Sequence, residues 1–93
     1  MPAVYADFKQ VINIKLTGGN PIPDLERMAM LFRRLTTNSL TLPDNLQALL
    51  LLASLPPKWD LIVQLYLQHT DLATMLMFAN VQAAVKQEYE HSN

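Results

Sequence analysis

Two groups of prolines enclose a short, strongly apolar segment near the middle of this chain. Pro43 stands immediately before the run Asp-Asn-Leu-Gln-Ala-Leu-Leu-Leu-Leu-Ala-Ser, and Leu55-Pro56-Pro57 comes immediately after it. Proline fits the first turn of a helix, where its missing N–H would have no intrahelical partner, but it prevents a helix from continuing. The segment therefore predicts a helix over residues 43–54 that ends abruptly.

Apolar residues occupy both sides of this predicted helix. One face carries Leu46, Leu49, Leu50 and Ala53, whereas the opposite side carries Leu51 and Leu52. A helix that is apolar all round is buried all round. We therefore expect either the central helix of a compact helical domain or a helix whose second face meets another chain.

The composition predicts one small domain with apolar surface left over. Of the 93 residues, 51% are hydrophobic and only 16% are charged, whereas average soluble domains have about 25% charged residues. Large apolar patches on a protein surface usually mark association sites. The formal net charge of −1 supplies no overall field that would attract nucleic acid.

Several further features bound the class of protein. The absence of cysteine excludes disulfides and thiolate metal sites and fits an intracellular, cytoplasmic protein. No segment reaches the ~20 uninterrupted apolar residues of a membrane span, and the N-terminus lacks the plan of a secretory signal. We expect residues 1–93 to be one domain, cut from a longer polyprotein, with a frayed tail at 91–93.

The spacing of apolar residues and turn formers predicts five helices and no paired strand. These helices are expected over residues 3–16, 22–36, 43–54, 57–68 and 71–90. The clearest loop is 17–21, in which Gly18 is expected to cap the first helix, although Ile12 to Leu16 alternates like a strand. The predicted fold class is all-α, a compact orthogonal bundle of about five helices.

The segment around the second proline group resembles a signature of copia-type LTR retrotransposon Gag polyproteins. The run Leu51-Leu52-Ala53-Ser54-Leu55-Pro56-Pro57-Lys58-Trp59-Asp60 is similar to the family's Leu-Leu-x-x-Leu-Pro turn, which an aromatic residue and Asp follow. The upstream run Leu31-Phe32-Arg33-Arg34-Leu35 is similar to the end of the family's preceding helix. The likeness covers roughly residues 20–90. In two departures, Trp59 stands where Tyr is commoner, and the Cys/His zinc knuckle that often follows is absent from this sequence.

The resemblance implies a retroviral-capsid-like lobe whose role is self-assembly. Such a domain would associate with copies of itself, as a homo-dimer or higher oligomer, to form the shell of a virus-like particle that packages the element's RNA. RNA would be bound only indirectly, through regions outside this chain, and no membrane or small-molecule substrate is expected. The alternative is a domesticated Gag-derived module of a host protein that dimerises or binds a partner helix. A DNA-binding helical domain is disfavoured, because the helix over 43–54 carries no Lys or Arg.

Three groups of residues are candidates for a functional or structural role. The candidate self-association interface consists of Leu51, Leu52, Met77 and Phe78. The expected structural turn and core consist of Leu55, Pro56, Pro57 and Trp59, although a tryptophan at a helix start can also anchor an interface. Arg33 and Arg34, the only adjacent basic pair, are weak candidates for RNA contact, and a solvated helix end is the preferred interpretation.

No catalytic or metal-binding constellation is visible in the sequence. His69 and His91 lie 22 residues apart and are expected in a loop and in the tail. None of the serines lies in the glycine-flanked turn that exposes a nucleophile, and Gly18-Gly19 is too short for a phosphate loop. We therefore expect no enzyme, no cofactor and no metal ion.

Overall fold

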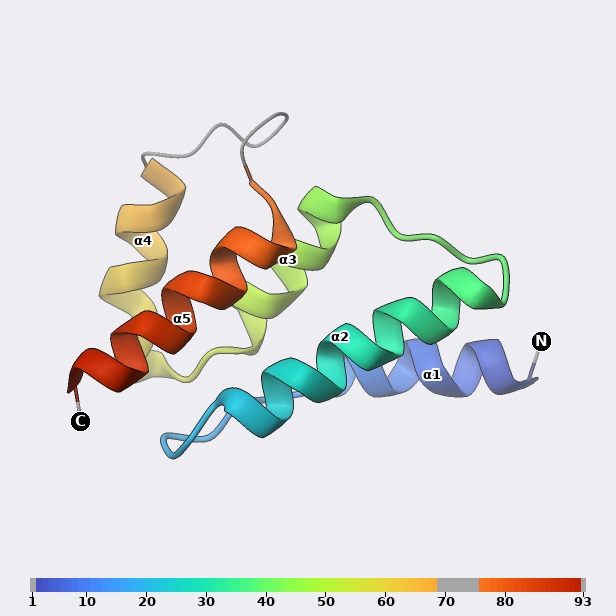
Figure 1. Cartoon of the computed structure of the whole chain (residues 1–93), viewed down its shortest axis with the longest axis horizontal. Helices are drawn as coiled ribbons and strands as arrows, with labels where there is room; N and C mark the ends of the chain where they lie inside the picture. Colours follow the sequence, from blue (N-terminus) through green and yellow to red (C-terminus); the bar gives the residue numbers. More distant parts are fainter. Residues whose placement is uncertain (1, 69–75, 93) are drawn as a thin grey trace.

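The structure, a computed structural model, describes residues 2–68 and 76–92, in which the regular elements are all helical. Its elements are α1 (Pro2–Asn13), α2 (Ile22–Thr37), α3 (Asp44–Ser54), the 3₁₀ turn η1 (Pro57–Trp59), α4 (Asp60–Gln68) and α5 (Phe78–Ser92) (Figure 1). The predicted all-α bundle of about five helices is confirmed, and the described residues contain no strand. The expected loop at His69 and the expected helix start at 71–75 lie outside the described residues.

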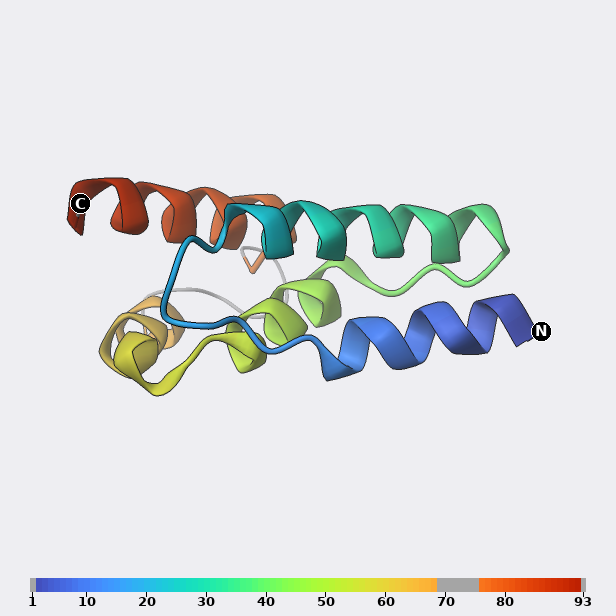
Figure 2. The same cartoon turned by 90° about the horizontal axis from the view of Figure 1, so that it is seen from below.

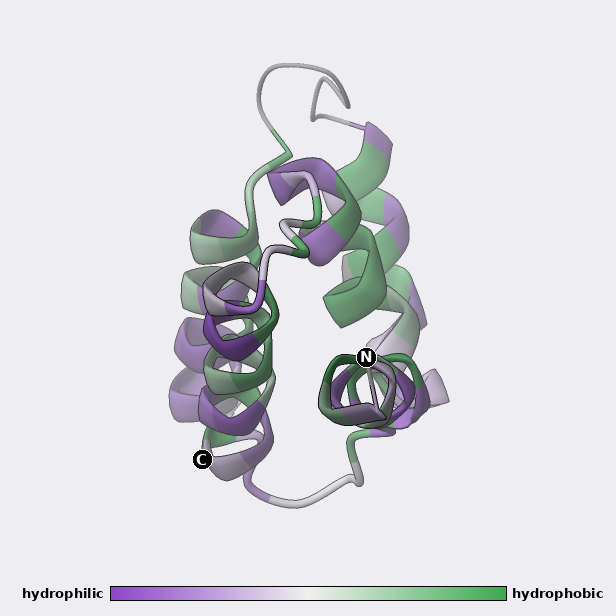
Figure 3. Cartoon of the chain, turned by 90° about the vertical axis from the view of Figure 1, so that its right-hand side faces the viewer, coloured by the Kyte–Doolittle hydropathy of each residue, from purple (hydrophilic) through white to green (hydrophobic). Residues whose placement is uncertain are grey.

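The helices are arranged in two layers. α2 and α5 lie in one layer, and α1, α3 and α4 lie in the other (Figure 2). The main helix–helix contacts join α1 to α2 and α3 to α5, whereas α4 contacts mainly the neighbouring η1 turn. Figure 3 shows the layers end-on and shows that α3 becomes almost continuously hydrophobic after its polar start. The core contains Val11, Ile14, Leu16, Leu25, Met28, Leu31, Phe32, Leu35, Ala48, Leu51, Leu52, Trp59, Leu76, Phe78, Val81 and Val85.

α2 supplies the longest buried face and ends in a well-defined cap. Its buried residues recur at helical spacing: Leu25, Met28, Leu31, Phe32 and Leu35. After the helix, Ser39 adopts a positive φ of 73°, and its N–H donates to the Thr36 carbonyl. The N–H of Leu40 donates to the Leu35 carbonyl, which completes a Schellman motif and satisfies carbonyls that the helix end leaves free.

The second proline group turns the chain sharply between α3 and α4. Leu55 and Pro56 have extended backbones, and the N–H of Trp59 donates to the Pro56 carbonyl over 2.9 Å to form η1. The Trp59 side chain is only 5% exposed and belongs to the core, while Leu55 packs partly buried against it. The turn therefore directs the indole inward as α4 begins.

The first helix is shorter than expected. α1 ends at Asn13, and the chain then runs extended with Ile14 and Leu16 buried and Lys15 exposed. The alternation of apolar and polar residues marks this extended segment, whose Leu16 N–H donates to the Ser54 carbonyl over 2.8 Å. The prediction that Gly18 caps the first helix is wrong, because the helix has already ended four residues before Thr17.

The expected orientation of the central helix is also wrong. α3 buries Ala48, Leu51 and Leu52, and it leaves Leu46 and Ala53 exposed. The side that carries Leu51 and Leu52 is the inner side, since α5 packs on it. Because α3 is apolar on both faces, its sequence is compatible with either face turned toward the core, and only the tertiary packing decides between them.

The last helix begins later than residue 71. Leu76 and Met77 are not helical, and α5 starts at Phe78. The Phe78 N–H, which has no intrahelical acceptor, donates to Oδ2 of Asp44 over 3.2 Å. That carboxylate lies in the first turn of α3 and also accepts the N–H at the start of α5. It therefore places a negative charge at the N-terminal ends of two helices, where such a charge is favourable.

Replacing Trp59 with alanine should destabilise the fold severely. Removing a buried aromatic side chain leaves a cavity and typically costs about 3–5 kcal/mol, so we expect a large fall in the free energy of unfolding in a denaturant titration. Leu61→Ala, two residues away but exposed, should change that free energy by less than about 0.5 kcal/mol. An unchanged denaturation midpoint for Trp59→Ala would show that the indole is not part of the core.

Candidate self-association surface

α4 exposes three leucines to solvent. The exposed fractions are 68% for Leu61, 48% for Leu65 and 43% for Leu67. Leu61 and Leu65 are one helical turn apart, on the side opposite Val63 and Tyr66, which pack partly buried against the core. We call Leu61 and Leu65 the α4 leucine face; Leu67 is also exposed but lies on the side of Val63, because residues two apart on a helix do not share a face.

Other exposed apolar side chains are scattered over the molecule. Leu46 at the start of α3 and Met77 before α5 are exposed, as are Tyr5, Ile12 and Met30 on α1 and α2. Single exposed apolar residues are normal on a protein surface. The α4 leucine face differs because its two members are neighbours on one nine-residue helix, which itself contacts mainly η1.

The structure separates the four residues that the sequence proposed as an interface. Leu51 is completely buried, and Leu52 and Phe78 are almost completely buried in the core of the same chain. The exposure expected of these three residues is therefore wrong; Phe78, which packs against Phe32, keeps about 8% of its surface open, at the edge of the hollow described next. Met77 alone is exposed, because it precedes α5 in a non-helical segment.

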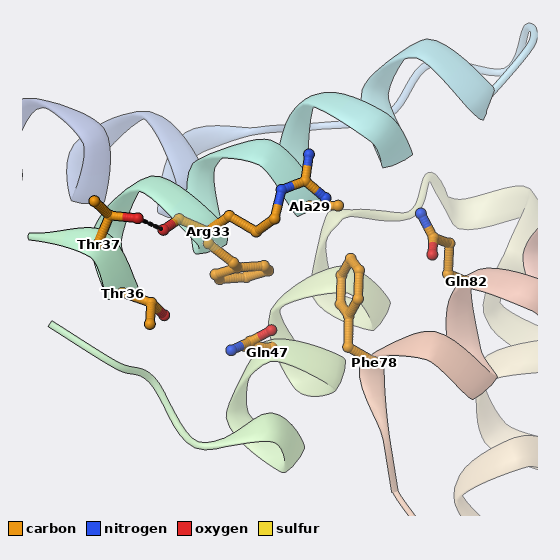
Figure 4. A pocket seen from close by; sticks show the side chains of 8 residues that line it. Ala29, Arg33, Thr36, Thr37, Gln47, Phe78 and Gln82 are labelled. Carbon is orange, nitrogen blue, oxygen red and sulfur yellow. Dashed lines mark hydrogen bonds between the residues drawn. The ribbon is translucent and has the colours of Figure 1, made fainter.

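A hollow of about 480 Å³ lies between α2, α3 and the start of α5. It is lined by Ala29, Phe32, Arg33, Thr36, Thr37, Gln47, Phe78 and Gln82. Figure 4 shows Arg33 extended along the α2 wall with its guanidinium beside Ala29, while Phe78 rises from α5 on the other side. Gln47 from α3 and Gln82 from α5 carry amide groups at its edge.

An aromatic pair forms the floor of this hollow. The rings of Phe32 and Phe78 meet edge to face, with centroids 5.3 Å apart and planes at 82°. This arrangement is a favourable one for two aromatic rings. The hollow therefore combines an apolar floor with a few polar groups and one cation at its rim, which is the usual make-up of a binding site.

The two adjacent arginines point to different surfaces. The Arg34 guanidinium lies 3.1 Å from Oδ1 of Asp7 on α1, whereas Arg33 lines the hollow. Neighbouring residues on a helix do not face each other, so the two cations form no joint patch. Among the residues that the structure describes, Arg33 has no carboxylate partner, and RNA contact by either arginine stays a prediction.

Asp7 is a buried carboxylate with one unsatisfied oxygen. Its side chain is only 3% exposed, and Oδ2 has no hydrogen-bond partner in the described part of the chain. Arg34, by contrast, is about half exposed. The pair joins α1 to α2, and it holds a charge that would otherwise be costly at this depth.

A second, shallower groove runs between α1 and α2. It is lined by Tyr5, Ala6, Lys9, Gln10, Asn13 and Arg27, and Lys9 Nζ lies 5.4 Å from the centre of the Tyr5 ring.

Within residues 2–68 and 76–92, no three His, Cys, Asp or Glu side chains gather as metal ligands. No helix in those residues has the length and apolar character needed to cross a bilayer.

Sequence reasoning missed the α4 leucine face and the hollow for different reasons. Leu61 and Leu65 lie opposite Trp59, Val63 and Tyr66 at helical spacing, so that spacing alone could have identified them as outward. The hollow joins Arg33, Gln47 and Gln82 from three helices, and no local pattern links such residues.

No known protein family matches this chain, and neither a characterised protein nor a solved structure shows significant similarity to it. The likeness to copia-type Gag therefore rests on the short runs around residues 31–35 and 51–60. Any function must be argued from those runs and from the surfaces described above.

Removing the partner of the buried Asp7 carboxylate should destabilise the protein. Arg34→Met leaves the charge uncompensated, and we expect the free energy of unfolding to fall by roughly 1–3 kcal/mol, since Arg34 is half exposed. Adding Asp7→Leu to Arg34→Met removes the stranded charge and should recover much of that loss. A double variant that is as unstable as the sum of the two single variants would contradict a coupled pair.

Proposed function

We propose that this chain is a self-associating assembly module, comparable in role to the capsid region of copia-type Gag polyproteins. The observation that carries the proposal is the α4 leucine face, two leucines one helical turn apart that the fold leaves in contact with water. The all-α fold and the low content of charged residues are consistent with this role.

The free energy available from α4 suits a weak, repeated contact. Complete burial of a leucine side chain is worth about 1.5–3 kcal/mol, and the members of the α4 leucine face are already partly covered. One such contact would be only marginal after the entropy cost of association. Many copies that each make the same contact would nevertheless hold together through multivalency, as a shell requires.

The likeness to Gag supplies the identity of the assembly, and the surface supplies its chemistry. The Leu-Leu-Ala-Ser-Leu-Pro-Pro run contains the last turn of α3 and the proline turn that presents α4, since Pro57 begins η1 and α4 follows at Asp60. In this proposal the family-like motif is a structural device, and the outward leucines that follow it make contact with another copy. RNA would be packaged by regions outside this chain.

A variant with charges on α4 tests the proposal. We combine Leu61→Asp with Leu65→Lys, because an acid in the first turn and a base near the end both favour the helix dipole and leave the net charge unchanged. In sedimentation equilibrium, the wild-type chain should form reversible dimers or larger species at micromolar to millimolar concentration. The charged-α4 variant should associate at least about tenfold more weakly, since its apolar contacts are lost.

Two measurements make this result specific. Circular dichroism should show unchanged helicity for the charged-α4 variant, and Ile12→Gln, on the exposed side of α1, should associate like the wild type. Association should also survive added salt, because burial of apolar area is not screened. A wild-type chain that stays monomeric at its highest soluble concentration would refute self-assembly and favour the domesticated module that grips a different partner.

A further inference from the structure

We propose that the hollow between α2, α3 and α5 is the receptor for α4 of a second copy of this chain, with Leu61 seated against the Phe32–Phe78 pair and Asp60 beside Arg33. This inference rests on the proposed self-association and specifies its geometry. It makes the contact heterologous: two different surfaces of the chain meet, one from each copy.

The hollow has the size and chemistry to take a leucine and the helix turn that carries it. Its volume of about 480 Å³ lies within the ~300–1,000 Å³ range of binding pockets. Ala29 and the two phenylalanines supply apolar surface, and Gln47 and Gln82 supply amides at the edge. A leucine entering this space would bury apolar surface on both partners, which favours association.

The start of α4 has the matching chemistry. Among the side chains that the structure describes, Leu61 is the most exposed large apolar one, and exposed Asp60 directly precedes it. Arg33 at the rim of the hollow has no carboxylate partner within the described residues. A copy that inserts Leu61 would therefore bring a carboxylate to the level of that guanidinium, where the two opposite charges would fix the register of the contact.

The local charges favour the same pairing. α4 carries one charged residue, Asp60, and Arg33 is the one charged residue that lines the hollow. A like pairing of two α4 surfaces would bring two carboxylates together. A head-to-tail pairing instead brings the Asp60 carboxylate of one copy to the Arg33 guanidinium of the next.

The two surfaces also lie at different places on the molecule. α4 stands at one end of the long axis, and the later turns of α2 and the first turns of α3 lie away from it along that axis in both views (Figures 1 and 2). A copy bound through its α4 therefore leaves its own hollow open for another copy. Such contacts repeat until they close a ring or continue as an open chain.

Mixing two defective variants tests this geometry. The charged-α4 variant keeps the hollow but loses the leucine, and Thr36→Trp keeps α4 but fills the hollow from an exposed position on its α2 wall. We expect each variant alone to associate at least about tenfold more weakly than the wild type. Their mixture should form a 1:1 complex that grows no further, because only one intact contact remains. Met30→Trp, exposed on α2 but outside the hollow, should associate like the wild type.

The outcomes separate this inference from the function on which it rests. If Thr36→Trp associates as strongly as the wild type, or if the mixture stays monomeric, the hollow is not the receptor although self-association stands. A monomeric wild type would refute the proposed function itself. A charge exchange at two exposed positions is a test that leaves the core unchanged. Arg33→Asp and Asp60→Arg should each weaken association by about threefold, and the chain that carries both substitutions should associate as strongly as the wild type. Failure to recover would overturn the Arg33–Asp60 pairing.

Discussion

The abrupt end of α3 at Leu55-Pro56-Pro57 is the constraint on which the rest of the fold depends. In a continuing helix the Ser54 carbonyl would accept the N–H of the residue four positions later. Because the prolines stop the helix, that carbonyl accepts the Leu16 N–H instead. Just beyond the turn, Lys58 Nζ donates to the Gly18 carbonyl over 2.7 Å. The proline stop therefore ties the segment between α1 and α2 to the α3–α4 turn, and it joins the two halves of the molecule.

Helix existence could be predicted from this sequence, whereas orientation and some boundaries could not. α2 follows its apolar spacing within one residue of the expected bounds, since only one face of it is apolar. α3 is apolar on both sides, so the inner face depends on where α5 packs. The start of α5 depends on Asp44, which lies 34 residues earlier and which no local pattern connects with Phe78. The segment from Ile14 to Leu16 is extended because the Leu16 N–H finds its acceptor, the Ser54 carbonyl, at the end of α3 and not within a helix of its own.

The candidate surface follows the same division. The outward position of Leu61 and Leu65 is local information, set by the helical period once Trp59 is placed inside. The hollow cannot be predicted from local spacing, because it forms only when α2, α3 and α5 pack together. Leu51 and Leu52 are candidates for an interface in the sequence because the central helix is apolar on both sides, but both side chains are buried in the core of the same chain, as Phe78 is. The surplus apolar surface that the composition predicts lies one helix further on, in α4.

In the proposed assembly, α4 of one copy meets the hollow of another. Methyl resonances recorded in a dilution series test this contact most directly, because each leucine and alanine methyl reports its own surroundings in the unmodified chain. We expect the methyl signals of Leu61, Leu65 and Ala29 to shift with concentration, while those of buried Leu25 and Leu51 stay constant. Shifts confined to Leu61 and Leu65, with Ala29 unchanged, or shifts confined to α1 would contradict this contact.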